Sequence, residues 1–204
     1  AVSNELALDC VVTGKSDLID RVLDSGSVEE YEREHLEPGR ALPGAEVRQW
    51  WLRTNDELAA ALVAADPEVR IPWGPNQMSV TSFTTARLME TWAHGLDCYA
   101  AAGVKPVDTA RLHHIAHLGL RTLPYAFGIR GLPAPGPVRL VLTAPDGSFW
   151  RIGAEDAPSS VTGTAGDWCR VVTRRDRAGE RDRLRADGPD GATVIANAQA
   201  YLSA

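Results

Sequence analysis

Four polar residues recur along one face of an otherwise apolar segment, residues 86–99. Arg87, Glu90, His94 and Asp97 follow one another at intervals of three, four and three residues. On an α-helix, residues three or four apart are neighbours, so these four form one polar stripe. The other positions of the segment are nearly all apolar: Ala86, Leu88, Met89, Trp92, Ala93, Leu96, Cys98 and Tyr99. Apolar residues on most sides predict neighbours on most sides, which favours a helical bundle with the polar stripe lining a cleft between helices.

The first hundred residues are predicted to be mainly helical. Apolar positions recur with a helical period over residues 45–65, and Asp66-Pro67 ends this helix. Shorter helices are expected at residues 5–12, 16–23 and 28–34, the last capped by Ser27. Proline and glycine predict irregular loops at residues 37–44 and 71–77. Ser79 or Thr81 then caps the helix of the polar stripe, which is expected to end near residue 102, before Gly103.

The pattern changes after a further helix at residues 109–123, which Asp108 is expected to cap. Residues 128–137 are rich in proline and glycine and are typical of a linker. Strands are predicted at residues 138–143, 149–153 and 160–162, with a turn at Pro145-Asp146-Gly147 between the first two. Helices are predicted at residues 164–173 and 193–202. The fold class is therefore mainly α with a small α+β part, in three segments: 1–104, 105–137 and 138–204.

Composition excludes several classes of function. The chain has 204 residues and a net charge of −6, which argues against nucleic acid as a partner because phosphate binding needs clustered positive charge. The basic run at residues 170–185 is interrupted by acidic residues and is interpreted as a solvated face. No apolar run approaches the roughly 20 residues that cross a bilayer, so no membrane partner is expected. Three cysteines far apart in sequence indicate no disulfide framework and favour a reducing cytoplasm.

The polar stripe has two interpretations. Glu90 and His94 stand one helical turn apart, so a carboxylate and an imidazole could bind one metal ion, and Zn²⁺ usually takes three protein ligands and a water in catalytic sites. Alternatively the stripe is a solvated face, with ion pairs that contribute only about 0.2–0.5 kcal/mol each. His35, His113, His114 and His117 are weak candidates for a third ligand and are interpreted as packing or surface residues. Cys98 and Cys169 are predicted to be small core residues.

Several strings carry a resemblance to a known family. They are RLMETWAHGLD (87–97), the preceding loop with Pro72, Trp73, Gly74, Pro75, Met78 and Ser79, then HIAHLGLRTLPYAFGIRGLP (114–133), VRLVLTAPDG (138–147) and VTG (161–163). The chain resembles the mycothiol-dependent, maleylpyruvate isomerase-like branch of the DinB superfamily, and more closely an uncharacterised metal-binding subgroup of it. The resemblance implies a DinB-like four-helix bundle followed by a C-terminal α+β domain. The chain starts at Ala1 inside an expected helix, so the first helix of the bundle is expected to be missing or truncated.

The resemblance implies a divalent metal, typically Zn²⁺, held by a Glu and a His on one helix and by a second His on an earlier helix. Glu90 and His94 match the first two ligands, and the third would lie just upstream of Ala1. The characterised relatives also bind the thiol mycothiol, whose pKa a metal can lower. Under this scheme Asp97 orients His94 or a metal-bound water, while Arg87 holds a carboxylate. Arg121 is a further candidate for binding an anionic cofactor or substrate, and a structural ion pair is an equal alternative.

Three functions remain open from the sequence. The first is a cytoplasmic metalloenzyme that uses mycothiol to isomerise, or transfer sulfur to, a small electrophilic or unsaturated substrate. The second is an enzyme whose metal-bound water acts directly in hydrolysis or acid–base chemistry. The third is a non-catalytic protein that binds a metal or a small ligand. The expected partners are a small-molecule substrate and a thiol, with a homodimer as a further possibility, and fold alone does not separate these functions.

Overall fold

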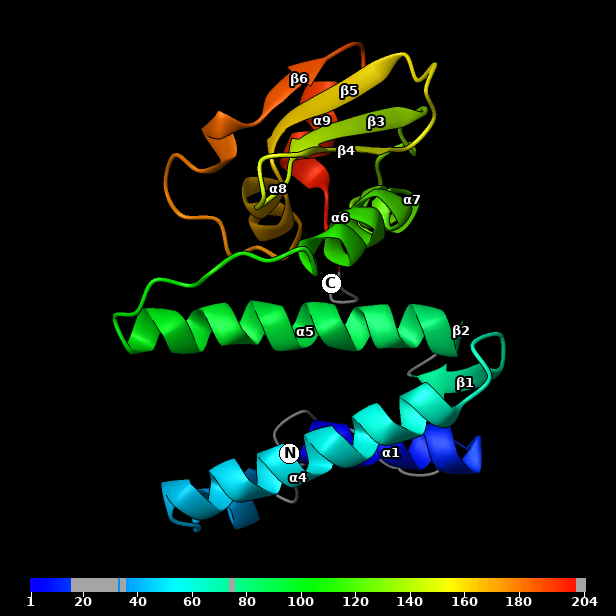
Figure 1. Ribbon diagram of the computed structural model, residues 1–204. Coiled ribbons are helices and arrows are strands. Elements are labelled where there is room, and N and C mark those ends of the chain that lie inside the picture. The colour runs from blue at the N-terminus through cyan, green and yellow to red at the C-terminus, as the bar shows by residue number, and fades with distance from the viewer. Residues whose placement is uncertain (16–32, 34–35, 74–75, 201–204) are drawn as a thin grey trace. The chain divides into compact units, whose positions relative to one another are not determined.

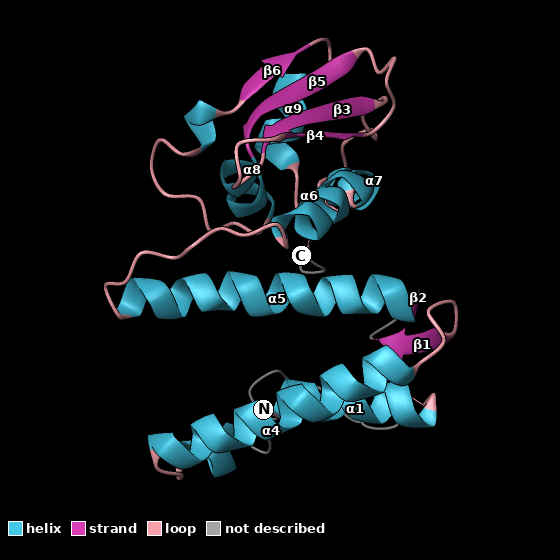
Figure 2. Cartoon of the chain, in the orientation of Figure 1, coloured by secondary structure: helices cyan, strands magenta, loops and turns pink. Residues whose placement is uncertain are grey.

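The computed structural model describes residues 1–15, 33, 36–73 and 76–200 (Figure 1). The chain divides into two compact units, residues 1–84 and 85–204. The segments 1–104, 105–137 and 138–204 predicted from the sequence differ from these units and stay a prediction about domains. Helices predominate, and strands are concentrated in the second unit (Figure 2), which confirms a mainly α fold with a C-terminal α+β part. In the described part of the chain, no helix is both long and apolar enough to cross a membrane.

The first unit pairs two helices with a short hairpin. Helix α1 covers Val2–Thr13 and helix α4 covers Gly44–Ala64. The indole Nε1 of Trp50 donates a hydrogen bond of 2.6 Å to Oε1 of Glu5, which links the two helices. The apolar core of this unit, which we call the N-terminal core, consists of Ala7, Leu58, Ile71, Val80 and Phe83.

Two loop predictions in this unit are wrong. Residues 37–40, inside the expected loop 37–44, are helical. Strands β1 (Arg70–Trp73) and β2 (Asn76–Ser79) form an antiparallel hairpin where a loop at 71–77 was expected. Pro72 is tolerated because a two-stranded sheet has only edge strands, so its missing N–H need not disrupt a ladder. The helices predicted at 16–23 and 28–34, the Ser27 cap and His35 lie outside the described residues, apart from helical Arg33.

Helix α5, Val80–Ala101, carries the polar stripe and has the predicted ends. The Ser82 backbone N–H donates to the Ser79 hydroxyl at 3.2 Å, so Ser79 provides the expected cap. Gly103 has φ 66, and the N–H of Val104 donates to the carbonyl of Tyr99. This left-handed glycine ends the helix, as the sequence predicts.

The second unit combines a four-stranded sheet with helices (Figure 1). Its strands are β3 (Val138–Thr143), β4 (Phe149–Ile152), β5 (Ser159–Thr164) and β6 (Arg185–Asp187), in the order β4-β3-β5-β6. Only β3 and β5 are parallel, and the connection between β5 and β6 contains helix α8 (Ala165–Val172) and a 3₁₀ turn at Arg181–Arg183. Helices α6 (Leu112–Arg121), α7 (Leu123–Gly128) and α9 (Gly191–Asn197) complete the unit.

The apolar residues of this unit form one cluster, which we call the C-terminal core. Alternate residues of β3, including Leu140 and Leu142, are buried, as expected for a strand with one face on a core. They belong to the same cluster as Trp168 and Val172 of α8 and Val194 of α9. The sheet therefore packs its apolar face against helices, as the predicted α+β layout requires.

Several local predictions for this unit are confirmed and others are wrong. Thr164 caps α8 by accepting a hydrogen bond of 3.0 Å from Asp167 N–H, and Gly147 with φ 85 forms the expected turn. The single helix 109–123 is wrong at both ends: α6 covers 112–121, and a separate helix, α7, begins at Leu123 with Pro124 in its first turn, where proline is tolerated. The sequence does not predict strand β6. Helix α9 covers 191–197, so it begins and ends earlier than the predicted helix 193–202.

Asp108 does not cap a helix, because α6 begins only at Leu112; its carboxylate pairs with Arg170. The two cysteine predictions have opposite outcomes. Cys169 is fully buried, as expected, whereas Cys98 is exposed, so its assignment to the core is wrong. A step of one residue from Asp97 turns Cys98 away from the polar stripe, but it also brings the thiol to solvent rather than to a core.

Candidate functional site

His94 lies between two carboxylates on helix α5. Its Nε2 is 3.4 Å from Oε2 of Glu90, and its Nδ1 is 3.4 Å from Oδ2 of Asp97. This arrangement follows from the sequence, because residues four before and three after His94 are its neighbours along the helix surface. The His94 side chain is 66% exposed, so the imidazole is open to a ligand from solution.

Asp97 is held in turn by Arg175, from the segment that follows α8. The guanidinium Nε and Nη2 of Arg175 donate hydrogen bonds of 2.8 and 2.9 Å to the two carboxylate oxygens of Asp97. Nη1 of Arg175 also donates to the Thr173 carbonyl at 3.0 Å. The hydrogen bonds from Arg175 hold the pKa of Asp97 below its ordinary value, so this carboxyl stays ionised beside His94.

The interpretation of residues 170–185 as a solvated face is wrong for Arg175. Its side chain is 27% exposed, and it joins the polar stripe from a distant part of the sequence. Arg170 and Arg181 of the same run also form ion pairs, with Asp108 and Asp176. No spacing in the sequence identifies these partners, because the tertiary fold alone brings residue 175 to residue 97.

The polarity of the His94 ring explains what the stripe can bind. An ionised Asp97 favours the neutral tautomer that donates from Nδ1, which leaves a lone pair on Nε2. In that tautomer Nε2 of His94 and Oε2 of Glu90, 3.4 Å apart, are both acceptors. A cation, either a proton on Nε2 or a metal ion, relieves the repulsion between them.

The spacing of these two acceptors fits a metal ion. Two atoms bonded to Zn²⁺ at about 2.0–2.1 Å with tetrahedral geometry lie about 3.4 Å from each other. The distance between His94 Nε2 and Glu90 Oε2 is 3.4 Å. Asp97 faces the opposite ring nitrogen, so it cannot share that ion and instead has the place of a carboxylate that orients a ligating histidine. Within the described residues, no cluster of three or more His, Cys, Asp or Glu could hold a metal, so the structure provides a two-ligand pair.

The two predicted arginines lie in different surroundings. Arg87 is half-buried on the stripe, and burial lowers its pKa, while the nearby charge of Glu90 acts in the opposite direction. Arg121 is exposed in the last turn of α6, where its charge lowers the pKa of His117 in addition to the larger effect of burial. The structure thus brings Arg87 to the stripe, and it places Arg121 beside a histidine of α6. The ligand-binding roles of both stay predictions.

The remaining described histidines pack around one another on α6. The ring of His113 lies 4.7 Å from that of His117 and 4.9 Å from Trp150, centroid to centroid. Burial lowers the pKa of His113, and the charge of His114 lowers it further. His113 therefore has a packing role against β4, in agreement with the interpretation of these histidines as packing or surface residues.

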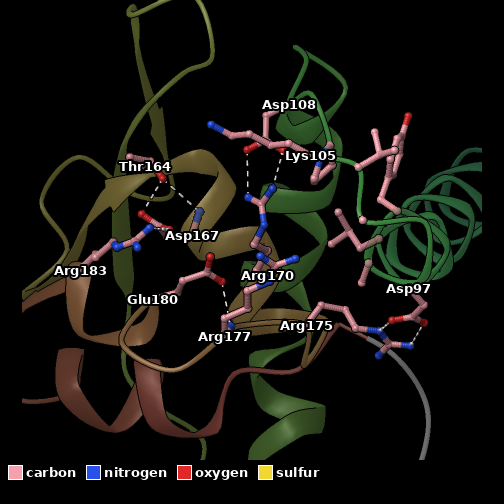
Figure 3. Close-up of a pocket in the computed structure, with 16 residues that line it drawn as sticks. Asp97, Lys105, Asp108, Thr164, Asp167, Arg170, Arg175, Arg177, Glu180 and Arg183 are labelled. Carbon is pink, nitrogen blue, oxygen red and sulfur yellow. Dashed lines mark hydrogen bonds and ion pairs between the residues drawn. The ribbon is translucent and has the colours of Figure 1, made fainter.

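A cleft of about 960 Å³ opens beside Asp97 within the second unit. The end of α5, the segment 103–108, the start of α8 and the segment 175–183 line it, and Figure 3 shows their charged side chains. Arg170 closes one side: it donates to both oxygens of Asp108 at 2.8 and 2.9 Å and lies 5.7 Å from the Trp92 ring. The absence of a side chain at Gly166 gives room for this pair, because a Cβ there would collide with Asp108 and Arg170. The sequence did not predict this cleft.

Comparisons with known proteins agree with the resemblance. Residues 3–99 match the family model described as the mycothiol maleylpyruvate isomerase N-terminal domain. Two uncharacterised proteins of Mycobacterium tuberculosis, from strains CDC 1551 and H37Rv, are each 41% identical to this chain over 162 residues. The aligned region covers 79% of this chain and 63% of each relative, so the chain spans less than two thirds of their length.

No solved structure gives a significant match. The family match includes both residues of the acceptor pair, Glu90 and His94, together with Arg87 and Asp97. Residues 3–99 of this chain are therefore similar to the mycothiol maleylpyruvate isomerase N-terminal domain.

Proposed function

We propose that Glu90 and His94 bind a divalent metal, Zn²⁺ by preference, in a cytoplasmic enzyme that uses mycothiol on a small electrophilic or unsaturated substrate. The observation that supports this most is the acceptor pair: His94 Nε2 faces Glu90 Oε2 at 3.4 Å, the separation that two ligands of one Zn²⁺ adopt. The family match of residues 3–99 supports the thiol. A third ligand from outside the described residues completes the proposed site.

In this proposal the protein's own residues orient the histidine ligand and stabilise the charge of the substrate. Asp97, ionised and clamped by Arg175, accepts from Nδ1 of His94 and so keeps Nε2 available as a ligand. Arg87 offers a planar, permanently charged group that can hold a carboxylate of the substrate. The metal, when bound, lowers the pKa of a thiol and so supplies the thiolate as nucleophile at neutral pH.

Openness supports a reacting site over a structural one. The side chains of His94, Glu90 and Asp97 are 66%, 37% and 50% exposed, so a ligand can approach from solution. Structural zinc is usually enclosed by four protein ligands, whereas catalytic zinc keeps an open position. The exposed acceptor pair agrees with the second arrangement.

Metal content of the full-length protein tests the proposed ligands. Zinc is measured by mass spectrometry of metals after dialysis, in the wild type and in Glu90→Gln and His94→Ala. We expect about one equivalent in the wild type and loss of most of it in both variants, while Asp97→Asn weakens zinc affinity by about 10–100-fold. Glu46→Gln on α4 and His114→Ala on α6 are matched controls that keep full zinc. Equal zinc in all variants would contradict the metal site.

Thiol use is tested separately by calorimetric titration of the zinc-loaded protein with mycothiol. Binding in the wild type and its loss in His94→Ala are the expected results. A zinc site with no heat on addition of mycothiol would leave the metal ligands standing and contradict the role of the thiol.

A further inference from the structure

Three of the four acidic side chains that line the cleft beside Asp97 are already paired with arginines. Asp97 is paired with Arg175, Asp108 with Arg170 and Asp167 with Arg183, at closest distances of 2.8, 2.8 and 3.5 Å. The remaining acid of the lining, Glu180, accepts a hydrogen bond of 2.8 Å from the backbone N–H of Arg177 (Figure 3). Each carboxylate therefore has a donor from the protein and little capacity left for a cationic ligand.

Two cationic side chains that line the cleft are not paired with a carboxylate in the described part of the chain. In the described part of the chain, the side chains of Lys105 and Arg177 form no ion pair. Lys105 lies on the segment between α5 and α6, and Arg177 follows α8, so the two come from different walls of the cleft. Five cationic and four acidic side chains line the cleft, and the surplus is positive.

The wall formed by the end of α5 and the residues after it is apolar. Leu96, Tyr99, Val104 and Pro106 line the cleft. Tyr99 is 44% exposed and Val104 is 52% exposed, so two large apolar side chains face solvent at this place. A volume of about 960 Å³ is in the range of pockets that bind small organic molecules.

We propose that this cleft binds an amphipathic organic anion, its carboxylate attracted by the charges of Lys105 and Arg177 and its apolar body against Tyr99 and Val104. The carboxylate gains charge-assisted hydrogen bonds from groups that have no competing carboxylate in the described structure. The apolar body removes exposed apolar surface from water. Asp97 belongs to both the cleft and the polar stripe, so the two share one edge. Binding of the anion is independent of the proposed function. The further step, that this anion is the substrate, rests on the proposed function.

Binding of 2-naphthoate to the zinc-loaded full chain tests the proposal, because this probe has a carboxylate and a fluorescent apolar body. Its affinity is measured by fluorescence titration at about 0.15 M salt, where screening of long-range attraction is substantial. We expect the double variant Lys105→Gln/Arg177→Gln to raise Kd by about tenfold or more. The neutral amide 2-naphthamide, with the same ring system, should bind the wild type at least about tenfold more weakly for the same reason.

The control removes the same charge elsewhere in the unit. Arg111→Gln/Arg151→Gln neutralises two exposed arginines that do not line the cleft, and its Kd should stay within about twofold of the wild type. His94→Ala should retain 2-naphthoate binding, and the Lys105/Arg177 variant should retain zinc, which separates the cleft from the metal site. Failure of the wild type to bind, equal affinity for the amide, equal effects of the two double variants, or loss of binding in His94→Ala would each overturn the proposal.

Discussion

At the scale of single residues, burial distinguishes two of the cysteines, Cys98 and Cys169. Cys169 is fully buried in α8, where desolvation raises the pKa of its thiol well above the ordinary value, and the charge of Asp108 acts in the same direction. Cys98 is exposed one position after Asp97. Both residues follow an aspartate or tryptophan in an apolar helical segment, so the sequence alone gives them the same appearance, and it predicted the core for both.

The raised pKa of Cys169 predicts how stability depends on alkaline pH. In the unfolded chain the thiol ionises near its ordinary value of 9.0, whereas in the folded chain it remains protonated. The contribution to folding is therefore complete below about pH 9 and is lost as pH rises toward the folded pKa. We expect the free energy of unfolding, from urea titrations between about pH 7 and pH 10.5, to fall more steeply with pH in the wild type than in Cys169→Ala.

The matched control for this prediction is Cys98→Ala, which should keep the wild-type slope because it removes an exposed thiol and leaves Cys169 buried. Only slopes are compared, since Cys169→Ala also lowers stability at every pH by leaving a cavity. Identical slopes in the wild type and Cys169→Ala would contradict the prediction.

The residues of the polar stripe show which parts of the candidate site can be predicted from intervals in the sequence. Glu90, His94 and Asp97 could be grouped from the sequence, because intervals of three and four residues have a fixed meaning on a helix. Arg175 could not, because 78 residues separate it from Asp97. The charge of Arg175, which keeps Asp97 ionised, could therefore be identified only from the tertiary structure.

At the scale of elements, the contact between α6 and α8 depends on Gly119. A Cβ at this position would lie 2.8 Å from Cγ1 and 3.0 Å from Cγ2 of Val172. Gly119 is buried within α6, a place where glycine would otherwise be disfavoured relative to alanine. The close approach of the two helices explains why a glycine stands there.

Gly119→Ala is therefore expected to destabilise the protein. Overpacking of a tight core costs about 1–3 kcal/mol, which outweighs the gain in helix propensity of roughly 0.8–1 kcal/mol. Chemical denaturation measures this change, and Val172→Ala in the same chain should recover part of the loss by removing the two methyl groups that the new Cβ meets.

Gly128→Ala, at the end of α7, serves as the control because a Cβ there has no neighbour within 4 Å. We expect its effect to stay within about 0.5 kcal/mol. If Gly119→Ala were as stable as this control, the close contact between α6 and α8 would be absent in solution.

At the scale of the whole molecule, the chain has two separate apolar cores. The N-terminal core and the C-terminal core share no residue, and each lies in its own compact unit. The family match of residues 3–99 extends past the division at residue 84, so the matched domain and the compact units do not coincide. Helix α5 contributes Val80 and Phe83 to the first core and Met89 to the second.

Separate cores predict that a cavity in one unit loosens that unit first. Leu140 is fully buried in β3, and Leu140→Ala should cost about 2–5 kcal/mol. Hydrogen exchange followed by mass spectrometry should then show faster exchange in β3, β5 and α8, while α1 and α4 keep their wild-type rates.

Val63→Ala provides the comparison, since Val63 is 88% exposed on α4 and its truncation should leave exchange unchanged. Equal acceleration in both units of Leu140→Ala would show that the two cores unfold together and would contradict the prediction.

The sequence by itself determined what depends on near neighbours along the chain. The helix of the polar stripe, its Ser79 cap and Gly103 end, the β3–β4 turn at Gly147 and the Glu90–His94 pair all rest on intervals of a few residues. Local backbone geometry and hydrogen bonding suffice to specify such features. The family resemblance rests on strings after about residue 70, and the family match of residues 3–99 confirms it.

Only the tertiary structure decided which distant residues meet. It paired Arg175 with Asp97 and Asp108 with Arg170, assembled the cleft, and set the β1–β2 hairpin where prolines had indicated a loop. It also exposed Cys98 while burying Cys169. These outcomes depend on which surfaces lose water when the chain folds, and such burial is a property of packing among elements that no local interval in the sequence encodes.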